Sequence, residues 1–353
     1  MEMNNISALP KVECTGCGSC YNCCPVDAIQ MKPDKRGFLF PVVLSKRCIN
    51  CSQCVSACPI LTKEVPCQQK EPVCYAAWSK NEAVRFCSTS GGVFTHLAEA
   101  ILDQGGLVAG ARYRQDHLVE HTLIQSKNNI EQLRQSKYVQ SETGLVFRQI
   151  KEALISGKPV LFVGTPCQCA GLRSYLGKSY EKLYQCDFIC RGVNAPAVYL
   201  AYLKKLEDQY KSPVKQIWFK NKTFGWNNFC TKIIFEDGQV YLADRETDPY
   251  MLGYIKSKLS CYMRDCCYDC KFKGISRHTD ITLGDFWGIK NIPNLENGVS
   301  VVLLHTEKAN SFFFYLSDIE YQEKNLQDVL PSNVCIQRSV WIADKLKYSW
   351  EEL

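Results

Sequence analysis

The hydrophobic pattern of this 353-residue chain changes at residue 74. Before it, the run 37–43 (GFLFPVV) is typical of a strand. After it, compact apolar runs typical of buried strands alternate with segments whose apolar residues recur at helical spacing. The predicted strands are 74–78, 107–113, 159–163 and 183–190, and the predicted helices are 93–106, 145–157, the segment through AGLRSYL (170–176), and 194–210. This alternation predicts an α/β unit, in which 159–163 is a buried parallel strand.

The later pattern is less regular. Residues 214–243 alternate as an antiparallel hairpin with Asp237-Gly238 at its turn, and 280–288 is a strand followed by a turn. After residue 305 we expect a strand–helix pattern that packs on the core. The predicted domains are a cysteine-rich module at 1–62, a linker at 63–73, an α/β module at 74–305 and a C-terminal extension at 306–353. The fold class is thus α+β followed by α/β.

Two complete copies of one cysteine run lie at the start of the chain, with a 34-residue period between Cys14 and Cys48. Each has the spacing C-x2-C-x2-C-x3-C-P of the bacterial ferredoxin run, in which three thiolates hold one [4Fe–4S] cluster and the fourth ligates the other cluster. We therefore assign one cluster to Cys14, Cys17, Cys20 and Cys58, and the other to Cys48, Cys51, Cys54 and Cys24. Pro25 and Pro59 end the runs and are expected to start short helices.

Zinc knuckles and a disulfide framework are the alternatives, but zinc sites usually pair two CxxC motifs across a longer loop. Cys23 is off the spacing and is interpreted as a buried neighbour. The 22 cysteines, the absence of a signal sequence in the first residues and the absence of a membrane-length apolar run predict a cytoplasmic protein with reduced thiols. The net charge of +6 comes without a basic stripe bearing aromatic residues, so we expect no nucleic-acid partner.

Two loops between a predicted strand and a predicted helix contain small residues that suit a phosphate-bearing cofactor. The first is Ser90-Gly91-Gly92, and the second is Gly164-Thr165-Pro166 followed by Gln168. Each places backbone N–H groups at a helix N-terminus, where they bind phosphate well. Lys137 or Arg191 would balance the charge. An ordinary N-cap remains the alternative reading of such loops.

A second group of cysteines predicts a third [4Fe–4S] cluster. Cys267 and Cys270 form a CxxC pair, and Cys167 and Cys190 lie at the ends of two predicted strands, so the four thiolates can meet in space. Cys261 and Cys266 are competing ligands. Structural thiols or a redox pair are the alternatives.

Taken together, the later motifs resemble the coenzyme F420 hydrogenase/dehydrogenase beta-subunit family over residues 74–305. The matching pieces are Ser90-Gly91-Gly92, Ser136-Lys137-Tyr138-Val139, Gly164-Thr165-Pro166-Cys167-Gln168, Asp187 with Cys190 and Gly192, Cys267-x2-Cys270, and Asp280-Ile-Thr-Leu-Gly-Asp285. The resemblance implies an FAD-binding α/β module that exchanges electrons among clusters, flavin and a two-electron acceptor such as a deazaflavin.

The chain departs from the family pattern at two places. Arg191 replaces the usual His after Cys190, and Arg264-Asp265-Cys266-Cys267 replaces Arg-Pro-Ser-Cys. Use of F420 itself is therefore not assumed. The leading hypothesis is an iron–sulfur flavoprotein oxidoreductase whose partner is a redox protein or a small electron carrier. The alternative hypotheses are a non-catalytic electron-transfer subunit and an iron–sulfur adaptor without flavin.

Overall fold

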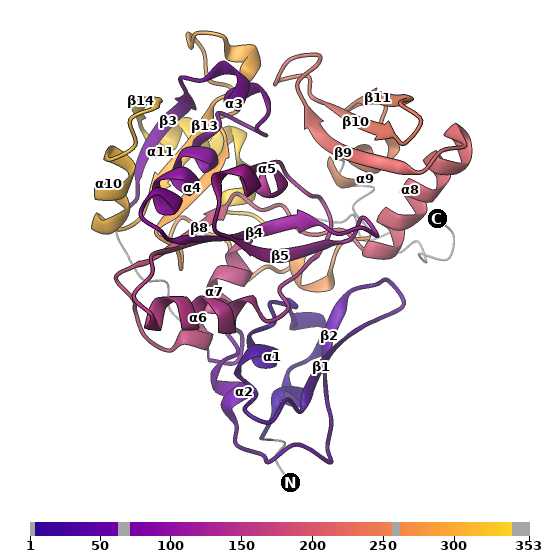
Figure 1. Cartoon of the computed structure of the whole chain (residues 1–353), viewed down its shortest axis with the longest axis vertical. Coiled ribbons are helices and arrows are strands. Elements are labelled where there is room, and N and C mark those ends of the chain that lie inside the picture. The colour runs from indigo at the N-terminus through magenta and orange to yellow at the C-terminus, as the bar shows by residue number, and fades with distance from the viewer. Residues whose placement is uncertain (1–3, 63–70, 256–261, 341–353) are drawn as a thin grey trace.

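The computed structural model describes residues 4–62, 71–255 and 262–340. Within them the chain has three parts: a small cysteine-rich module, a nine-stranded sheet with helices on both faces, and a three-stranded sheet (Figure 1). The module lies at one end of the molecule, against helices α6 (Val146–Ile155) and α7 (Pro166–Leu176) of the main sheet. In the described ranges, no helix combines the length and the apolar character needed to cross a bilayer.

The cysteine-rich module is built from two short helices and one strand pair. Its elements are α1 (Ser19–Cys23), β1 (Ile29–Pro33), β2 (Leu39–Val43) and α2 (Gln53–Ser56). β2 is the strand predicted at 37–43, and it pairs antiparallel with β1. The prediction that Pro25 and Pro59 start the helices is wrong, because α1 and α2 both end before these prolines. A proline disfavours helical geometry at the preceding residue, so it ends a helix there.

The main sheet is mixed rather than purely parallel. Its strands are β3 (Val73–Ser79), β4 (Leu107–Tyr113), β5 (Val119–Ile124), β6 (Ser141–Glu142), β7 (Val160–Val163), β8 (Leu183–Phe188), β12 (Ile281–Asp285), β13 (Ser300–Leu304) and β14 (Ile319–Lys324). They lie in the order β14-β3-β13-β12-β8-β7-β4-β5-β6. The central strands β12, β8, β7 and β4 are parallel, as predicted for 159–163. Strand β13 runs antiparallel to both of its neighbours, and β5 runs antiparallel to β4 but parallel to β6.

Helices cover both faces of this sheet and divide its core in two. Helix α4 (Val93–Asp103), with α3 (Glu82–Phe86) and α5 (Ile130–Leu133), lies on one face, and α6 and α7 lie on the other (Figure 1). Successive strand residues point to opposite faces. Leu161 therefore packs in the core beside α4, whereas Phe162 packs in the core beside α6 and α7.

The three-stranded sheet stands beside the main one. It contains β9 (Val214–Asn221), β10 (Cys230–Phe235) and β11 (Val240–Asp244), with α8 (Pro196–Tyr210) and α9 (Pro249–Ile255) nearby. The predicted turn at Asp237-Gly238 joins β10 to β11. The predicted hairpin is therefore a three-stranded meander, because 222–229 interrupts the alternation and separates β9 from β10.

The segment after residue 305 continues the main fold. Helix α10 (Glu307–Phe314) packs on β13, and β14 pairs antiparallel with β3 along its length. The short helix α11 (Leu326–Val329) follows. The expected domain boundary at 305/306 thus falls between two strands of one sheet. Most of the expected linker (63–70) and residues 341–353 lie outside the described residues.

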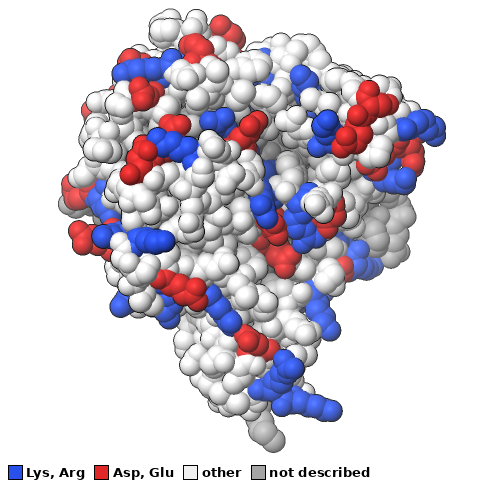
Figure 2. Space-filling model, in the orientation of Figure 1, with Lys and Arg blue, Asp and Glu red and all other residues white. Residues whose placement is uncertain are grey.

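On the face in Figure 2, Lys and Arg are interspersed with Asp and Glu.

Candidate functional site: two cysteine sites and a large cavity

The first predicted cysteine set lines one cavity in the N-terminal module. Cys14, Cys17, Cys20 and Cys58 surround it, and we call this the inner site. All four side chains are buried. Gly16 (φ +71°) and Gly18 (φ +79°) lie between the first three cysteines in left-handed conformations that favour glycine. These turns bring three thiols from a short stretch of chain to one space.

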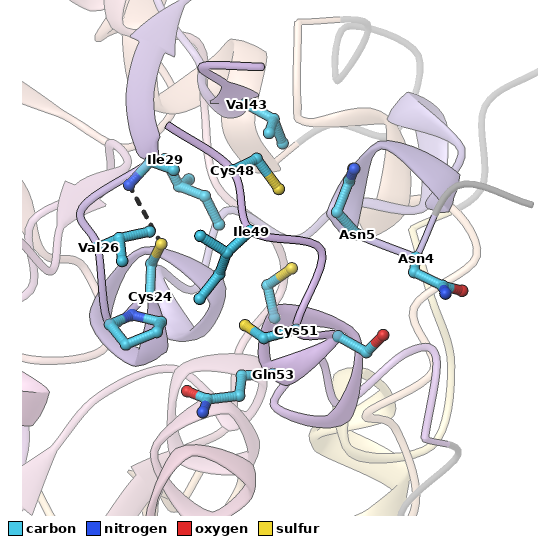
Figure 3. Close-up of a pocket in the computed structure, with 14 residues that line it drawn as sticks. Asn4, Asn5, Cys24, Val26, Ile29, Val43, Cys48, Ile49, Cys51 and Gln53 are labelled. Atoms are coloured by element: carbon cyan, nitrogen blue, oxygen red, sulfur yellow. Dashed lines mark hydrogen bonds between the residues drawn. The ribbon is translucent and has the colours of Figure 1, made fainter. Parts of the chain in front are cut away.

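The second set lines a neighbouring cavity, which we call the outer site. It is bordered by Cys24, Cys48, Cys51 and Cys54, and Figure 3 shows three of these side chains on different sides of the space. The backbone N–H of Ala28 donates a hydrogen bond of 3.1 Å to the Cys24 sulfur. Cys51 is exposed, so the outer site lies nearer to solvent than the inner one. The crossed assignment, in which each run lends its last cysteine to the other site, matches this arrangement.

The chemistry of both sites fits iron–sulfur clusters. Each site supplies four sulfur ligands, which is the donor set of a [4Fe–4S] cluster. Burial raises the pKa of the Cys17 thiol to about 12 and also raises the pKa of Cys58. These thiols stay protonated at neutral pH without metal, so iron binding would release their protons. Cys23 lines neither cavity, and its thiol donates to the Cys20 carbonyl at 3.3 Å.

A much larger cavity, of about 850 Å³, lies between the main sheet, the three-stranded sheet and the N-terminal module. Its lining contains eight of the nine residues that the sequence suggested for a phosphate-bearing cofactor: Ser90, Gly92, Lys137, Gly164, Thr165, Pro166, Gln168 and Arg191. The exception is Gly91. Its N–H donates to the Ser300 hydroxyl at 2.9 Å, and a Cβ there would lie 2.3 Å from the carbonyl oxygen of Ala77. Gly91 therefore serves close packing on the sheet.

The start of α4 and the loop before β6 meet at one side of this cavity. Gly92 (φ +93°) caps α4, and no side chain caps the helix there. The backbone N–H of Ser136 donates to the Thr89 hydroxyl at 2.9 Å, which joins the two loops. Beside this junction, the Lys137 ammonium donates to the carbonyl of Arg134 at 2.7 Å. Burial lowers the pKa of Lys137 to about 7, and in the described ranges no carboxylate forms an ion pair with it. A helix N-terminus and a half-buried lysine together suit an anion.

The start of α7 differs from the phosphate site that the sequence suggested. Thr165 and Gln168 form a capping box, in which the Thr165 N–H donates to the Gln168 side chain at 3.0 Å. The Gly164 N–H donates to the Cys186 carbonyl at 3.1 Å. Pro166 has no N–H, so most donors of this loop are already used. Arg191 likewise donates to the carbonyls of Tyr254 and the following residue, both at 2.8 Å, and ties α9 to this wall.

The third cysteine set lies in the same cavity. Cys167, Cys190, Cys267 and Cys270 all line it. Electrostatic interaction with the other three thiols contributes, after burial, to raising the pKa of Cys167. The four residues thus line one space, although they come from the ends of β7 and β8 and from the loop after α9. Their all-sulfur donor set fits a cluster. Cys266 also lines the cavity, and Cys261 is outside the described residues.

Helix α7 connects this third cysteine set with the inner site. Cys167 lies at its start, and Gly171 lies one turn later on the same side. A Cβ on Gly171 would lie 2.8 Å from the Cys17 sulfur, so the inner site packs directly on the helix. The Thr143 hydroxyl also donates to the Cys17 carbonyl, at 3.1 Å. The N-terminal module is therefore held against the helix that carries a ligand candidate of the third set.

Sequence reasoning missed one polar group in the cavity wall. The Lys220 ammonium lies 2.5 Å from an Asp285 oxygen, and the Trp226 indole N–H donates to the other oxygen at 2.8 Å. The ammonium also lies 4.6 Å from the ring centre of Trp287. Burial lowers the pKa of Lys220, and Asp285 opposes that shift. Asp285 was part of a recognised motif, but alternation along β9 does not reveal that Lys220 faces a cavity.

Two four-cysteine sites in an N-terminal module, joined to a mixed α/β unit, define an iron–sulfur redox protein. Residues 13–61 match a 4Fe-4S dicluster domain. Residues 74–147 and 157–327 match the N-terminal and C-terminal domains of the coenzyme F420 hydrogenase/dehydrogenase beta subunit. The chain belongs to this family, as the ordered motifs predicted.

Several solved chains match this one, and one of them illustrates the shared fold. It is a chain of the F420-reducing [NiFe] hydrogenase complex from Methanosarcina barkeri, with a TM-score of 0.50 and 18% sequence identity. The match covers 77% of this chain and 90% of that one. At this identity the likeness concerns the fold. Among curated proteins, none matches the chain.

Proposed function

We propose that this chain is an iron–sulfur flavoprotein oxidoreductase that binds FAD in the large cavity. The observation that carries the proposal is the shared cavity: the third cysteine set and the junction of α4 with Lys137 line one space. A cluster and a flavin held there would lie in the same enclosure. The family membership supports a role in electron transfer, and the name of the family supports a deazaflavin-like partner.

The cavity has the size and lining for a flavin dinucleotide. Its volume of about 850 Å³ is within the range of cofactor sites, which run to about 1,000 Å³. Lys137 and the N-terminus of α4 would hold the pyrophosphate, because together they offer positive charge and free backbone donors. The start of α7 is not part of this phosphate site in our proposal, since its capping box uses the donors. Its dipole would instead favour negative charge at the third cysteine set.

When bound, FAD would supply the exchange between single electrons and electron pairs. The chain's own residues supply placement and enclosure. Cys167, Cys190, Cys267 and Cys270 would hold the third cluster beside the flavin. Helix α7 fixes the distance to the inner site through the contact of Gly171 with Cys17. The exposed Cys51 at the outer site marks the side from which a protein carrier would approach.

The two-electron partner would occupy the part of the cavity near the three-stranded sheet. Lys220, Phe229, Arg245 and Trp287 line that part. Aromatic rings beside two cationic side chains suit a flat, anionic molecule, such as a deazaflavin or a related acceptor. Arg191 replaces the family's His and is engaged with backbone carbonyls. We therefore do not assign a proton-donor role to this position.

FAD content tests the proposal directly. Protein purified without oxygen should release FAD on denaturation, and flavin-free protein should take up one FAD per chain in a fluorescence titration. Lys137→Met should weaken this binding at least about tenfold, because a charged contact to phosphate is worth about 1.5–3 kcal/mol. Lys158→Met is the control, since Lys158 is exposed and lies outside the cavity. Full iron content without FAD uptake would instead support the non-catalytic electron-transfer subunit.

A further inference from the structure

Arg264 is a buried cation between the N-terminal module and the third cysteine set. Its side chain is 1% exposed. Its backbone is hydrogen-bonded beside the third cysteine set. The Arg264 N–H donates to the Val193 carbonyl at 3.0 Å, and the Cys267 N–H donates to the Arg264 carbonyl at 2.9 Å. The side chain, however, extends in the other direction, into the N-terminal module.

The guanidinium of Arg264 contacts the inner site. Nε donates to the Cys14 carbonyl at 2.7 Å, and Nη2 donates to the Leu39 carbonyl at 3.0 Å. Nη2 also lies 3.7 Å from the Cys14 sulfur, within hydrogen-bonding distance of a thiolate. The guanidinium carbon lies 4.1 Å from the ring centre of Phe40. One nitrogen of this buried Arg264 side chain thus points to a predicted cluster ligand.

The remaining nitrogen, Nη1, is buried and makes no hydrogen bond to any residue that the structure describes. It faces the loop between Cys14 and Cys17, because a Cβ on Gly16 would lie 2.9 Å from it. In the described ranges, no carboxylate forms an ion pair with Arg264. The neighbouring Asp265 pairs instead with Arg36, through two contacts of 2.9 and 2.8 Å. A buried cation without a counter-ion is costly, so the protein needs a negative group at this place.

A four-thiolate [4Fe–4S] cluster in the inner site would be that group, because it carries net negative charge. We propose that Arg264 is a positioning residue that raises the reduction potential of the inner cluster and so favours electron transfer to it from the outer cluster. Net charge and hydrogen bonds to sulfur set such potentials. A cation favours the reduced cluster, which has one more negative charge. With both clusters bound, one electron would pass from the outer cluster, which would be oxidised, to the inner cluster, which would be reduced, with no bond or proton transferred.

The inference rests on the cluster ligands of the N-terminal module and is independent of flavin. The Arg264 proposal and the FAD proposal can therefore fail independently of each other. The reduction potentials of the inner and outer clusters are measured by a redox titration of the full chain in its flavin-free form. Electron paramagnetic resonance detects the reduced clusters during the titration. Cys51→Ser identifies the signal of the outer cluster, because Cys51 lines only the outer of the two cysteine sites.

Arg264→Gln is the main variant and removes the charge. We expect the equilibrium for electron transfer from the outer to the inner cluster to fall at least about tenfold, which is a drop of about 59 mV in the inner potential. Arg264→Lys keeps the charge and should lie between wild type and Arg264→Gln. Arg36→Gln is the control, since it breaks the neighbouring ion pair without touching the cysteine loop, and it should leave both potentials unchanged.

Two results would overturn the proposal. One is an unchanged inner potential in Arg264→Gln protein with full iron content. The other is loss of the inner cluster's iron in both the Gln and the Lys variants, which would show that Arg264 holds the loop and does not tune the cluster. An equal shift of both potentials, or a shift of the same size in Arg36→Gln, would also contradict it.

Discussion

Gly171 marks the contact between α7 and the inner site, and a methyl group there tests this contact. A Cβ on Gly171 would lie 2.8 Å from the Cys17 sulfur and 2.9 Å from its Cβ. Overpacking of this kind costs about 1–3 kcal/mol, whereas Gly→Ala inside a helix gains about 1 kcal/mol. We therefore expect Gly171→Ala to lower the free energy of unfolding of the iron-loaded protein by about 0–2 kcal/mol.

The effect of Gly171→Ala should depend on iron. A cluster fixes the Cys17 sulfur, so the clash must move the helix or the module. In iron-free protein the Cys17 side chain is able to change rotamer, which relieves part of the clash and leaves the helix gain. The change in unfolding free energy should then be close to zero.

The free energy of unfolding is measured by anaerobic urea unfolding of the iron-loaded and of the iron-free protein. Circular dichroism monitors unfolding in both, and the visible absorbance of the clusters monitors it in the iron-loaded protein. Gly144→Ala is the matched control. It adds a Cβ at the same docking surface, where no atom lies within 4 Å, and its left-handed backbone (φ +50°) costs about 1–2 kcal/mol whether or not iron is present. If Gly171→Ala has the same effect with and without iron, the proposed contact between α7 and the cluster site is refuted.

Three further predictions concern the cavity and the docking surface. Burial lowers the pKa of Lys137 to about 7, and bound phosphate favours the charged form of this side chain. FAD affinity should therefore be constant below pH 7 and fall up to about tenfold per pH unit above pH 7. A pH-independent Kd for FAD would contradict this prediction. Arg148→Gln should cost about 2–4 kcal/mol in urea unfolding, because Arg148 donates to two carbonyls of the N-terminal module at 2.7 and 2.9 Å. Asp27→Asn, which removes only an exposed ion pair, should cost less than about 1 kcal/mol. Cys270→Ser should remove about four iron atoms per chain and leave FAD uptake intact, and unchanged iron would exclude Cys270 as a ligand.

The parts of the site that depend on short sequence separations were predictable. The spacing of Cys14, Cys17 and Cys20 places three thiols in one loop, and these three do line one cavity. That Cys58 joins them as a cluster ligand is the prediction of the ferredoxin motif. The capping box also had a sequence signal, because Thr165 and Gln168 have the spacing S/T-x-x-Q. That signal competes with the phosphate-loop interpretation, and the sequence does not decide between them.

Contacts between distant elements were not predictable in the same way. Lys220 and Asp285 are 65 residues apart and meet only because the three-stranded sheet stands beside the main one. Arg264 precedes Cys266 and Cys267 in the sequence, and its contact with Cys14 depends on how the module docks. Strands β1, β5, β6 and β13 were not predicted. Strand β6 has only two residues, and its pairing is set by tertiary structure. The predicted hairpin is a three-stranded meander for a different, local reason: residues 222–229 interrupt the alternation and separate β9 from β10.

The pairing of β14 with β3 has a consequence for biosynthesis. β3 is the first strand of the main sheet, and its neighbours β13 and β14 are the last ones, so the sheet is completed only when residue 324 has left the ribosome. All eight cysteines of the inner and outer sites are translated by residue 58. Domains at the N-terminus generally fold first during synthesis, and pairing of distant strands is slow. We therefore expect stalled nascent chains of about 100 residues to bind iron. The thiols of the inner site would then be accessible for cluster insertion until α6 and α7 have been synthesised and cover Cys17.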